Sequence, residues 1–249
     1  MYEKIKRLVY TLCYLVSITF FIISCQSEKI PELNLPIPPP GVIVPKEMVY
    51  VPDGEFIMGH PDHGKTVRGK KVYTHAYLID KFEVTNEQYK KFDPTYRYPE
   101  GQSNYPATYI SYSMAVQYLN FVGKRLPTEE EWEKAARGAD GRMFPWGDKV
   151  FGPPNYGFSG LVTEPVGKRK ALVSPFGAYD MVGNVWEWTS DWYSFEEMPK
   201  EHEKKFRVIR GGVLTVHLRS DYSYTFDRNY MQPKSRLNFI GFRGAKSIK

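Results

Sequence analysis

Apolar and charged residues are distributed very unevenly at the start of the chain. Lys4, Lys6 and Arg7 precede an apolar run, Leu8–Ile23, that contains no charged residue. A basic start followed by such a run is typical of a secretory signal peptide. The run is also short for a membrane span, which needs about 20 apolar residues. We therefore expect residues 1–24 to be an export signal outside the folded domain.

The residue that follows this run is a cysteine. Ile22-Ile23-Ser24-Cys25 resembles a bacterial lipobox, in which the cysteine thiol receives diacylglycerol. Each buried methylene of an acyl chain contributes about 0.8 kcal/mol, so lipidation of Cys25 would anchor the protein to a membrane. The alternative is an uncleaved signal anchor with an incidental cysteine. Residues 25–45 are rich in proline, which favours extended geometry, and predict a semi-rigid tether.

Short apolar segments separated by turn residues predict β-strands after the tether. Met48–Pro52 and Gly54–Gly59 flank an Asp53-Gly54 pair, which is a strong hairpin signal. Val72–Asp80 alternates well enough for one further strand. We expect the first two segments to pair with each other and the third to be a single strand.

Capping residues and apolar spacing predict helices in the first half of the domain. Three segments each follow a serine or threonine that can cap a helix: Asn86–Phe92, Tyr112–Gly123 and Trp132–Arg137. Before the third, Thr128 and Glu131 have the spacing of a capping box. From Gly138 onward the helix signals vanish, and glycine, proline and aromatic residues dominate. The second half should therefore consist of short strands and long loops.

Composition narrows the class of protein. The 249 residues are 42% hydrophobic, 25% charged and 16% aromatic, which excludes a disordered chain and a multi-span membrane protein. The net charge of +6 is scattered, so no nucleic-acid partner is expected. Both of the 2 cysteines, Cys13 and Cys25, precede the domain, which excludes a disulfide scaffold and a four-cysteine zinc site.

Seven strings of residues are too specific for generic loops. They are Asp53–Gly59, Phe82–Tyr89, Arg125–Glu133, Phe144–Asp148, Phe176–Thr189, Arg207–Gly212 and Gly241–Arg243. In this order they closely resemble the formylglycine-generating enzyme, or sulfatase-modifying factor, family over about Pro45–Ala245. The resemblance implies a single irregular, loop-rich α+β domain related to C-type lectins, which we place at residues 46–247.

The resemblance also predicts which chemistry is missing. The sulfatase-activating members oxidise a substrate cysteine with copper(I) held by two cysteines, because soft copper(I) prefers thiolate ligands. The corresponding positions here are Val216 and Asp221. Neither side chain can replace a thiolate, so we expect no copper and no formylglycine formation.

A calcium motif of the family is retained. The resemblance implies a structural calcium ion held by the side chains of Asp180 and Glu187 and the carbonyls of Gly183 and Val185, and calcium prefers oxygen ligands. One divalent ion could cross-link a loop-rich fold. The alternative is that both carboxylates bond to backbone amides without a metal.

The segment after Gly212 lies where the family builds its peptide-binding groove, and it is rich in tyrosine. The candidate groove residues are His217, Arg219, Asp221, Tyr222, Tyr224 and Arg236. Tyrosine and arginine are favoured at recognition hot spots, so a protein or peptide partner is expected.

The leading hypothesis is a non-catalytic, lipid-anchored subunit for protein binding or envelope assembly. It resembles in arrangement the gliding-motility and type IX secretion lipoproteins of Bacteroidetes. Because no aspartate follows Cys25, the outer membrane is preferred within a bacterial cell envelope. The alternative is an enzyme of the same superfamily that uses a cysteine-independent site in the groove.

Overall fold

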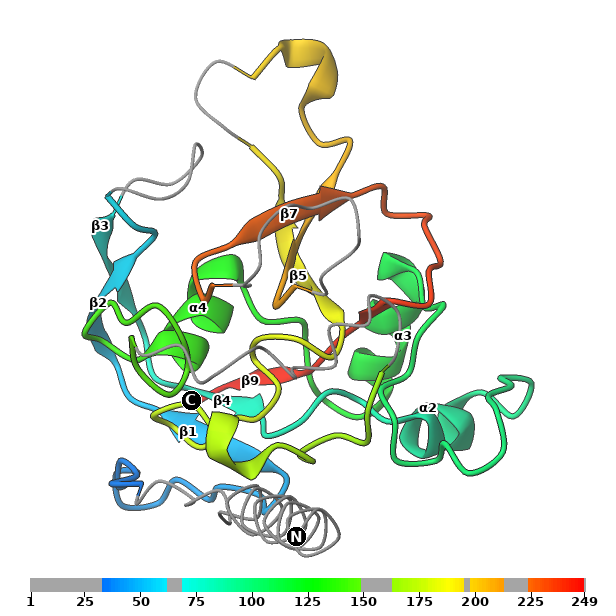
Figure 1. The fold of residues 1–249 in the computed structure, drawn as a ribbon, viewed down its shortest axis with the longest axis horizontal. Helices are drawn as coiled ribbons and strands as arrows, with labels where there is room; N and C mark the ends of the chain where they lie inside the picture. Colours follow the sequence, from blue (N-terminus) through cyan, green and yellow to red (C-terminus); the bar gives the residue numbers. More distant parts are fainter. Residues whose placement is uncertain (1–32, 62–68, 149–162, 195–197, 213–223, 249) are drawn as a thin grey trace, which may run out of the picture. The chain divides into compact units, whose positions relative to one another are not determined.

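Short β-strands form the framework of the molecule. A computed structural model describes residues 33–61, 69–148, 163–194, 198–212 and 224–248. These residues belong to one compact unit, Glu32–Lys249. Their strands form a three-stranded sheet in the order β1-β4-β9, a two-stranded ribbon β2-β3 and a four-stranded sheet β7-β6-β5-β8 (Figure 1).

The predicted hairpin around Asp53-Gly54 is wrong, although both of its strands form. β1 (Met48–Val51) pairs with β4 (Tyr77–Asp80), whereas β2 (Gly54–Met58) pairs with β3 (Lys70–Thr74), all antiparallel. All four residues of β1 are buried, while β2 alternates between buried and more exposed positions. A strand buried on both faces needs an interior partner, and β4 supplies it because its four residues are buried as well.

The segment Val72–Asp80 also differs from its prediction, since it contributes to two strands in different sheets. His75 and Ala76 separate β3 from β4. β4 lies at the centre of the three-stranded sheet because it also pairs with β9 (Ala245–Ser247). The two ends of the domain therefore meet in one sheet. Burial of Tyr77–Asp80, rather than the alternation along the chain, decided where the strand breaks.

The four-stranded sheet carries the later motifs. It consists of β5 (Trp186–Trp192), β6 (Arg207–Arg210), β7 (Arg228–Met231) and β8 (Ile240–Gly241). β6 is antiparallel to β5 and β7, and β8 is parallel to β5. This confirms the prediction of short strands joined by long connections. The helical pieces described in this half are only the short 3₁₀ turns η1 (Lys170–Leu172) and η2 (Lys200–His202).

The three predicted helices are confirmed with small shifts in their bounds. α2 spans Asn86–Phe92 as predicted, α3 spans Tyr112–Phe121, and α4 spans Glu129–Arg137. Thr85 and Thr128 each form a capping box with the residue three positions later. α3 ends two residues early, and Gly123 follows with a φ of 68°. Such a left-handed backbone is typical just beyond a helix end.

Two large apolar clusters fill the interior on either side of the sheets. One lies beneath α2 and α3 and includes Tyr89, Tyr118, Trp188 and Phe242. The other packs against α4 and includes Trp132, Val51, Ile79 and Ala135. Of the 5 tryptophans, Trp132, Trp186 and Trp188 are buried, whereas Trp146 and Trp192 are half-buried. The first cluster thus packs against the four-stranded sheet, and the second joins α4 to the three-stranded sheet.

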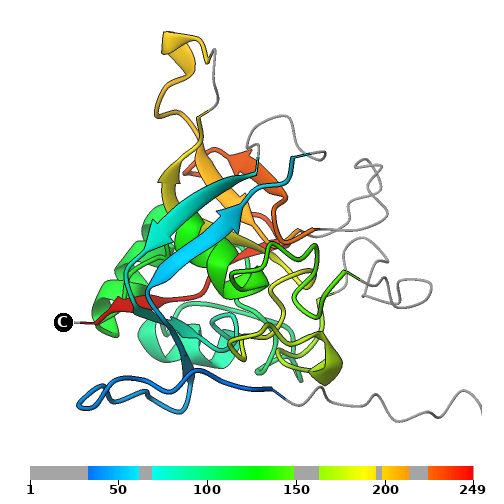
Figure 2. The same ribbon diagram turned by 90° about the vertical axis from the view of Figure 1, so that its left-hand side faces the viewer.

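Short segments outside the sheets lie at two opposite edges of the described unit. The chain before β1 and the η1 turn lie at the lower edge of Figure 1, and η2 projects at the upper edge, as Figure 2 shows from the side. None of the helices within the described ranges is long and apolar enough to cross a bilayer.

Candidate functional site

A network of buried charges lies beneath α4 and connects the helix to the four-stranded sheet. Arg210 of β6 binds Glu129 at 2.9 Å and Glu133 at 2.6 Å, and both carboxylates come from α4. Arg228 of β7 binds both carboxylate oxygens of Glu129, at 2.7 and 2.8 Å. Glu133 also accepts from Arg137 at 2.8 Å. Burial opposes the charge of Arg210, but the nearby Glu133 and Glu129 outweigh it and raise the pKa of Arg210.

The network fixes the chain on both sides of the Tyr-rich segment in which the candidate groove was predicted. On one side, Arg210 ends β6, and the Gly211 carbonyl accepts from the Gly183 amide at 2.9 Å. On the other side, Arg210 donates to the Thr225 carbonyl at 2.8 Å. The Thr225 hydroxyl in turn donates to the Met143 carbonyl at 3.0 Å. The rigid charged interior therefore holds both ends of this segment in place.

Gly211 allows a close approach at the first of these ends. It has a φ of 99°, and an added Cβ would lie 3.2 Å from the Val185 carbonyl oxygen and 3.3 Å from the Trp132 ring. A side chain here would be strained by the backbone angle and by the lack of space. The glycine at this position thus has a local physical reason, which is the contact with α4 and the loop before β5.

Five contacting rings form a continuous row next to the charge network. Phe144 and Trp146 stack at 5.0 Å, and Phe144 lies 5.3 Å from Tyr224. Tyr224 stacks on Phe226 at 4.9 Å, and Phe226 lies 5.1 Å from His60. We call these five residues the aromatic ladder. Phe144 and Phe226 are buried, while Tyr224 and Trp146 are half-buried, so the ladder presents part of its ring area at the surface.

The candidate groove residues are only partly brought together. His217, Arg219, Asp221 and Tyr222 lie outside the described residues, as does Val216. Tyr224 belongs to the aromatic ladder.

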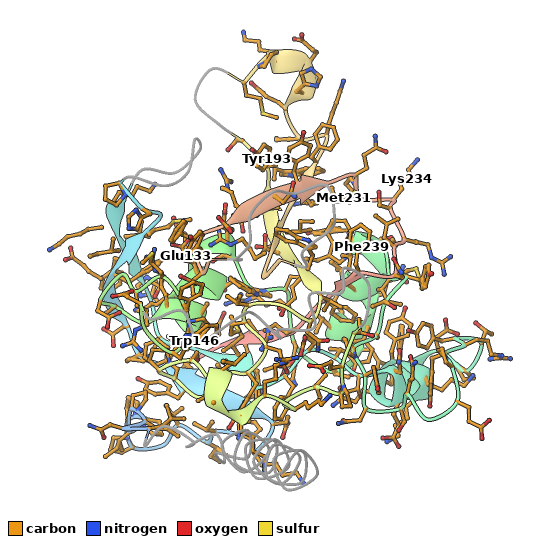
Figure 3. The ribbon with its side chains drawn as sticks, viewed as in Figure 1. Glu133, Trp146, Tyr193, Met231, Lys234 and Phe239 are labelled. Carbon is orange, nitrogen blue, oxygen red and sulfur yellow. The ribbon has the colours of Figure 1, made fainter. Side chains whose placement is uncertain are left out.

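Arg236 has different surroundings: it is exposed, and its Nε donates to the Tyr109 carbonyl at 2.8 Å, just before α3. In Figure 3, Lys234 and Phe239, which flank Arg236 in the chain, lie on the α3 side, whereas Trp146 lies on the α4 side with Glu133. Its hydrogen bond to Tyr109 therefore places Arg236 beside the start of α3.

Of the predicted calcium ligands, Glu187 is already fully engaged by the protein. Its Oε2 accepts from Arg243 Nε at 2.7 Å and from Trp132 Nε1 at 2.9 Å. Its Oε1 accepts from the other end of the same guanidinium at 2.7 Å. Both Glu187 and Arg243 are 0% exposed. This bidentate pair locks β5 to the chain before β9.

Asp180 lies close to a carboxyl group that sequence reasoning missed. Asp180 Oδ2 accepts from the Gly167 amide at 2.6 Å, and Asp180 has a φ of 57°. Burial is the main cause that raises the pKa of Asp180, and the hydrogen bond from the Gly167 amide partly opposes it. Burial also raises the pKa of Glu83 well above its ordinary value, and the charge of Asp180 adds to this shift. A buried and a half-buried carboxyl group thus lie close together.

The oxygen atoms of Asp180, Glu83 and Glu187 meet the requirements of a calcium ion only in part. Glu83 Oε1 accepts from Asn184 at 2.9 Å, but the buried Oε2 has no hydrogen-bond partner. A buried carboxylate oxygen without a partner is costly, so a proton or a cation is needed there. Against a metal, Glu187 is occupied by Arg243, and no three His, Cys, Asp or Glu side chains of the described part of the chain are grouped to hold one. Glu83 and Arg243 both lie inside the family-like strings, which was the signal that could have identified them.

Comparisons with known proteins agree with this architecture. A sequence model of the sulfatase-modifying factor enzyme 1-like domain matches residues 39–248. The formylglycine-generating enzyme of Mus musculus is 29% identical over 279 aligned positions, which cover 80% of this chain and 74% of that protein.

Solved structures show the same fold. PvdO from Pseudomonas aeruginosa superposes with a TM-score of 0.63 and 25% identity, covering 81% of this chain and 94% of PvdO. Treponema denticola variable protein 1 also has a TM-score of 0.63, at 22% identity, covering 80% of this chain and 94% of that one. The fold is thus a single irregular α+β domain of the kind that the motifs predicted.

Proposed function

Because this chain belongs to the sulfatase-modifying factor family, we propose that it is a non-catalytic, membrane-anchored member that binds a protein or peptide partner in the bacterial cell envelope. One observation carries the proposal: Cys13 and Cys25 are the 2 cysteines of the chain, so residues 26–249 contain no thiol. Copper(I) sites depend on soft sulfur ligands. A domain without thiols cannot provide the thiolate pair that formylglycine formation uses in the family.

The aromatic ladder supports a binding role. Tyr224 and Trp146 are half-buried and present ring area at the surface, and the ring stacking holds them in place. Aromatic anchors with few rotatable bonds lose little conformational entropy when they bind. The charge network of Arg210, Glu129 and Glu133 keeps the chain behind the ladder rigid. A preorganised aromatic surface suits recognition of a protein or peptide.

The anchor is the second part of the proposal. Acylation of Cys25 would retain the domain at a membrane through the apolar chains alone. Metabolic labelling with an alkyne-bearing fatty acid should label the wild type and leave Cys25→Ser unlabelled. An unlabelled wild type with residues 1–24 still attached would instead support the uncleaved signal anchor.

The partner-binding test compares two tyrosine variants. The full chain, Tyr224→Ala and the control Tyr73→Ala are used to capture partners from envelope extract by crosslinking. Tyr73 is 53% exposed on β3, and its ring contacts His75 rather than a residue of the ladder, so its loss removes a surface ring outside the ladder. We expect Tyr224→Ala to reduce the captured partner at least tenfold, as is typical of a hot-spot residue, and Tyr73→Ala to leave it unchanged.

The same preparation tests the enzymatic alternative. The full chain is incubated with a cysteine-containing peptide, copper and oxygen, and the peptide mass is then measured. Conversion of the cysteine to an aldehyde would overturn the non-catalytic role. A different chemical change of the peptide, lost in Tyr224→Ala, would support an enzyme with a cysteine-independent site.

We also propose a structural calcium ion at Asp180, Gly183 and Val185, with Glu83 in the place predicted for Glu187, because Arg243 and Trp132 occupy both oxygens of Glu187. The unpartnered Oε2 of Glu83 and its closeness to Asp180 support this assignment. Calcium should raise the melting temperature of the wild type, and a chelator should reverse the gain. Asp180→Asn should remove the response, whereas the exposed control Asp148→Asn should keep it. Equal melting curves with and without calcium would favour a proton shared by Glu83 and Asp180.

A further inference from the structure

A second surface, lined by none of the residues of the aromatic ladder, combines a cavity with basic and apolar side chains. The cavity has a volume of about 410 Å³ and lies between the chain before β1 and the residues around η1. Its lining includes Leu35, Phe82, Tyr179, Lys46, Lys81 and Lys170. Figures 1 and 2 place the chain before β1 at the end of the molecule opposite η2. We call this surface the tether face.

The cations of the tether face are available to an anion. The ion pairs of the described residues do not involve Lys46, Lys81 or Lys170. Lys81 Nζ donates to the Lys46 carbonyl at 3.1 Å, which keeps the two lysines side by side. Three ammonium groups around one cavity create a positive potential that favours a phosphate group.

The acidic groups nearby do not cancel this charge. Glu164 pairs with Lys168 and Arg169, both at 2.7 Å, and Asp180 accepts the Gly167 amide. Glu47 is exposed beside Lys46. Lys168 and Arg169 precede η1 directly, so the charge excess on this side of the molecule is positive.

Exposed aliphatic side chains occur in the same proline-rich segment that contributes Leu35 to the cavity lining, and they favour an amphiphilic ligand. Ile37 is 90% exposed, Ile43 is 85% exposed and Leu35 is 49% exposed, and all three belong to the proline-rich segment. Large aliphatic side chains with this exposure, next to lysines, are typical of a surface that enters the boundary between lipid headgroups and acyl chains.

The floor of the cavity is closely packed. Phe82 and Tyr179 contact each other at 5.2 Å. Gly167 has a φ of 68°, and an added Cβ would lie 2.3 Å from the Phe82 ring. The cavity is therefore bounded by a fixed aromatic floor, which can pack against the glycerol and first methylenes of a lipid.

We propose that the tether face binds an anionic phospholipid, with Lys46, Lys81 and Lys170 around the phosphate and Ile37 and Ile43 in the acyl boundary. This inference rests on the proposed anchoring at Cys25, because an anchor brings the face to a bilayer. Cys25 precedes Leu33 by 8 residues. At about 3.5 Å per extended residue, these reach at most about 28 Å. The lysines would then orient the domain on the membrane.

The test uses the full chain in non-ionic detergent, with a short-chain phosphatidylglycerol as the probe. Binding is measured by calorimetry, and the acylation rate of each lysine by mass spectrometry. We expect the probe to slow acylation of Lys46, Lys81 and Lys170 but not of Lys200, Lys204 and Lys205 near η2. Replacing the first three lysines by alanine should weaken binding roughly a hundredfold, since each lysine near an anionic lipid contributes about a factor of five.

The control variant removes the same charge elsewhere, with alanine at Lys200, Lys204 and Lys205, and should bind the probe like the wild type. Equal weakening in both variants would mean unspecific charge attraction and would overturn the proposal. Inorganic phosphate that binds as tightly as the lipid would assign the cavity to free phosphate and overturn the lipid site. Because the probe is added in solution, the result does not depend on Cys25: unlabelled Cys25 with probe binding would refute the anchor alone.

Discussion

The interior beneath α2 and α3 consists of apolar side chains, whereas the interior beneath α4 also contains buried charged side chains. The first is an aromatic and aliphatic cluster in which Tyr89 contacts Phe92, Tyr96, Tyr118 and Phe242. The second adds to its apolar residues a buried network of Arg210, Glu129, Glu133, Arg137 and Arg228.

The two regions should respond differently to substitution. Apolar packing scales with the volume removed, and a substitution that conserves volume costs little. A buried charge network depends on every partner, because each remaining charge has lost its water. The network therefore contributes less to stability than its number of ion pairs suggests. Its value lies in holding the chain beside the aromatic ladder in one arrangement.

The largest effect is expected when one partner of the charge network is lost. Arg210→Ala would leave Glu133 and Glu129 buried with fewer counter-charges, and should lower the free energy of unfolding by about 3–5 kcal/mol. Urea unfolding monitored by tryptophan fluorescence measures the change. Arg142→Ala is the control, because its partner Asp140 has a side chain that is 56% exposed, and exposed pairs contribute roughly 1 kcal/mol or less. A loss below that of the control would contradict the role of the network.

In the apolar cluster, the free energy of unfolding should fall by an amount that depends on the side-chain volume removed. Leu119 of α3 is 0% exposed, and Leu119→Ala should cost about 2–5 kcal/mol through lost transfer energy and the cavity left behind. Leu119→Met, which nearly conserves volume, should cost less than about 1.5 kcal/mol in the same urea experiment. In contrast, Arg210→Met should not be markedly more stable than Arg210→Ala, because methionine carries no counter-charge. If both methionine variants behave alike, the contrast between the two regions is wrong.

The buried tyrosines of the aromatic cluster should also make the free energy of unfolding fall at alkaline pH. Burial raises the pKa of Tyr89 from 10.0 to about 12 and that of Tyr118 to about 12. Because the folded-state pKa is the higher one, the stabilisation is complete below pH 10 and is lost as the pH rises toward 12. Each tyrosine should therefore contribute roughly 2 kcal/mol to the decline over this range. Tyr89→Phe should flatten the decline, and an unchanged slope would contradict the assignment.

The smallest effect is expected at the start of α2. Thr85 accepts from the Gln88 amide, and Gln88 accepts from the Thr85 amide at 2.9 Å. Thr85→Ala should cost about 1 kcal/mol, and Thr85→Ser, which keeps the hydroxyl, should cost much less. Thermal unfolding is sensitive enough to measure the difference. Equal losses in both variants would show that packing of the threonine methyl matters more than the cap.

Local signals predicted those parts of the fold in which neighbouring residues make the decisive interactions. The helix at Asn86–Phe92 and the capping box at Thr128 follow from hydrogen bonds within four residues. The hairpin at Asp53-Gly54 failed because the turn signal is local, whereas strand pairing was decided by burial. The partner of β1 is β4, about thirty positions further on, and both strands are fully buried.

For the candidate site, too, local signals did not predict contacts between residues that are distant in the sequence. Its residues could be listed from motifs, but not their partners: Glu187 was predicted as a calcium ligand, and the structure places it in a bidentate pair with Arg243. Glu83 and Asp180 are about one hundred positions apart, and no periodicity in the sequence connects them. The groove prediction placed Tyr224 and Arg236 together, whereas the structure gives them different neighbours.

By itself, the sequence determined the family, the helices and the absence of any thiol after Cys25, because these depend on residue identity and on short-range spacing. Only the tertiary structure decided which charges meet and which rings stack, because such contacts join residues that the chain keeps far apart. Desolvation is the physical reason that these contacts matter. A carboxylate such as Glu133 is tolerable in the interior only where the fold brings two arginines to it.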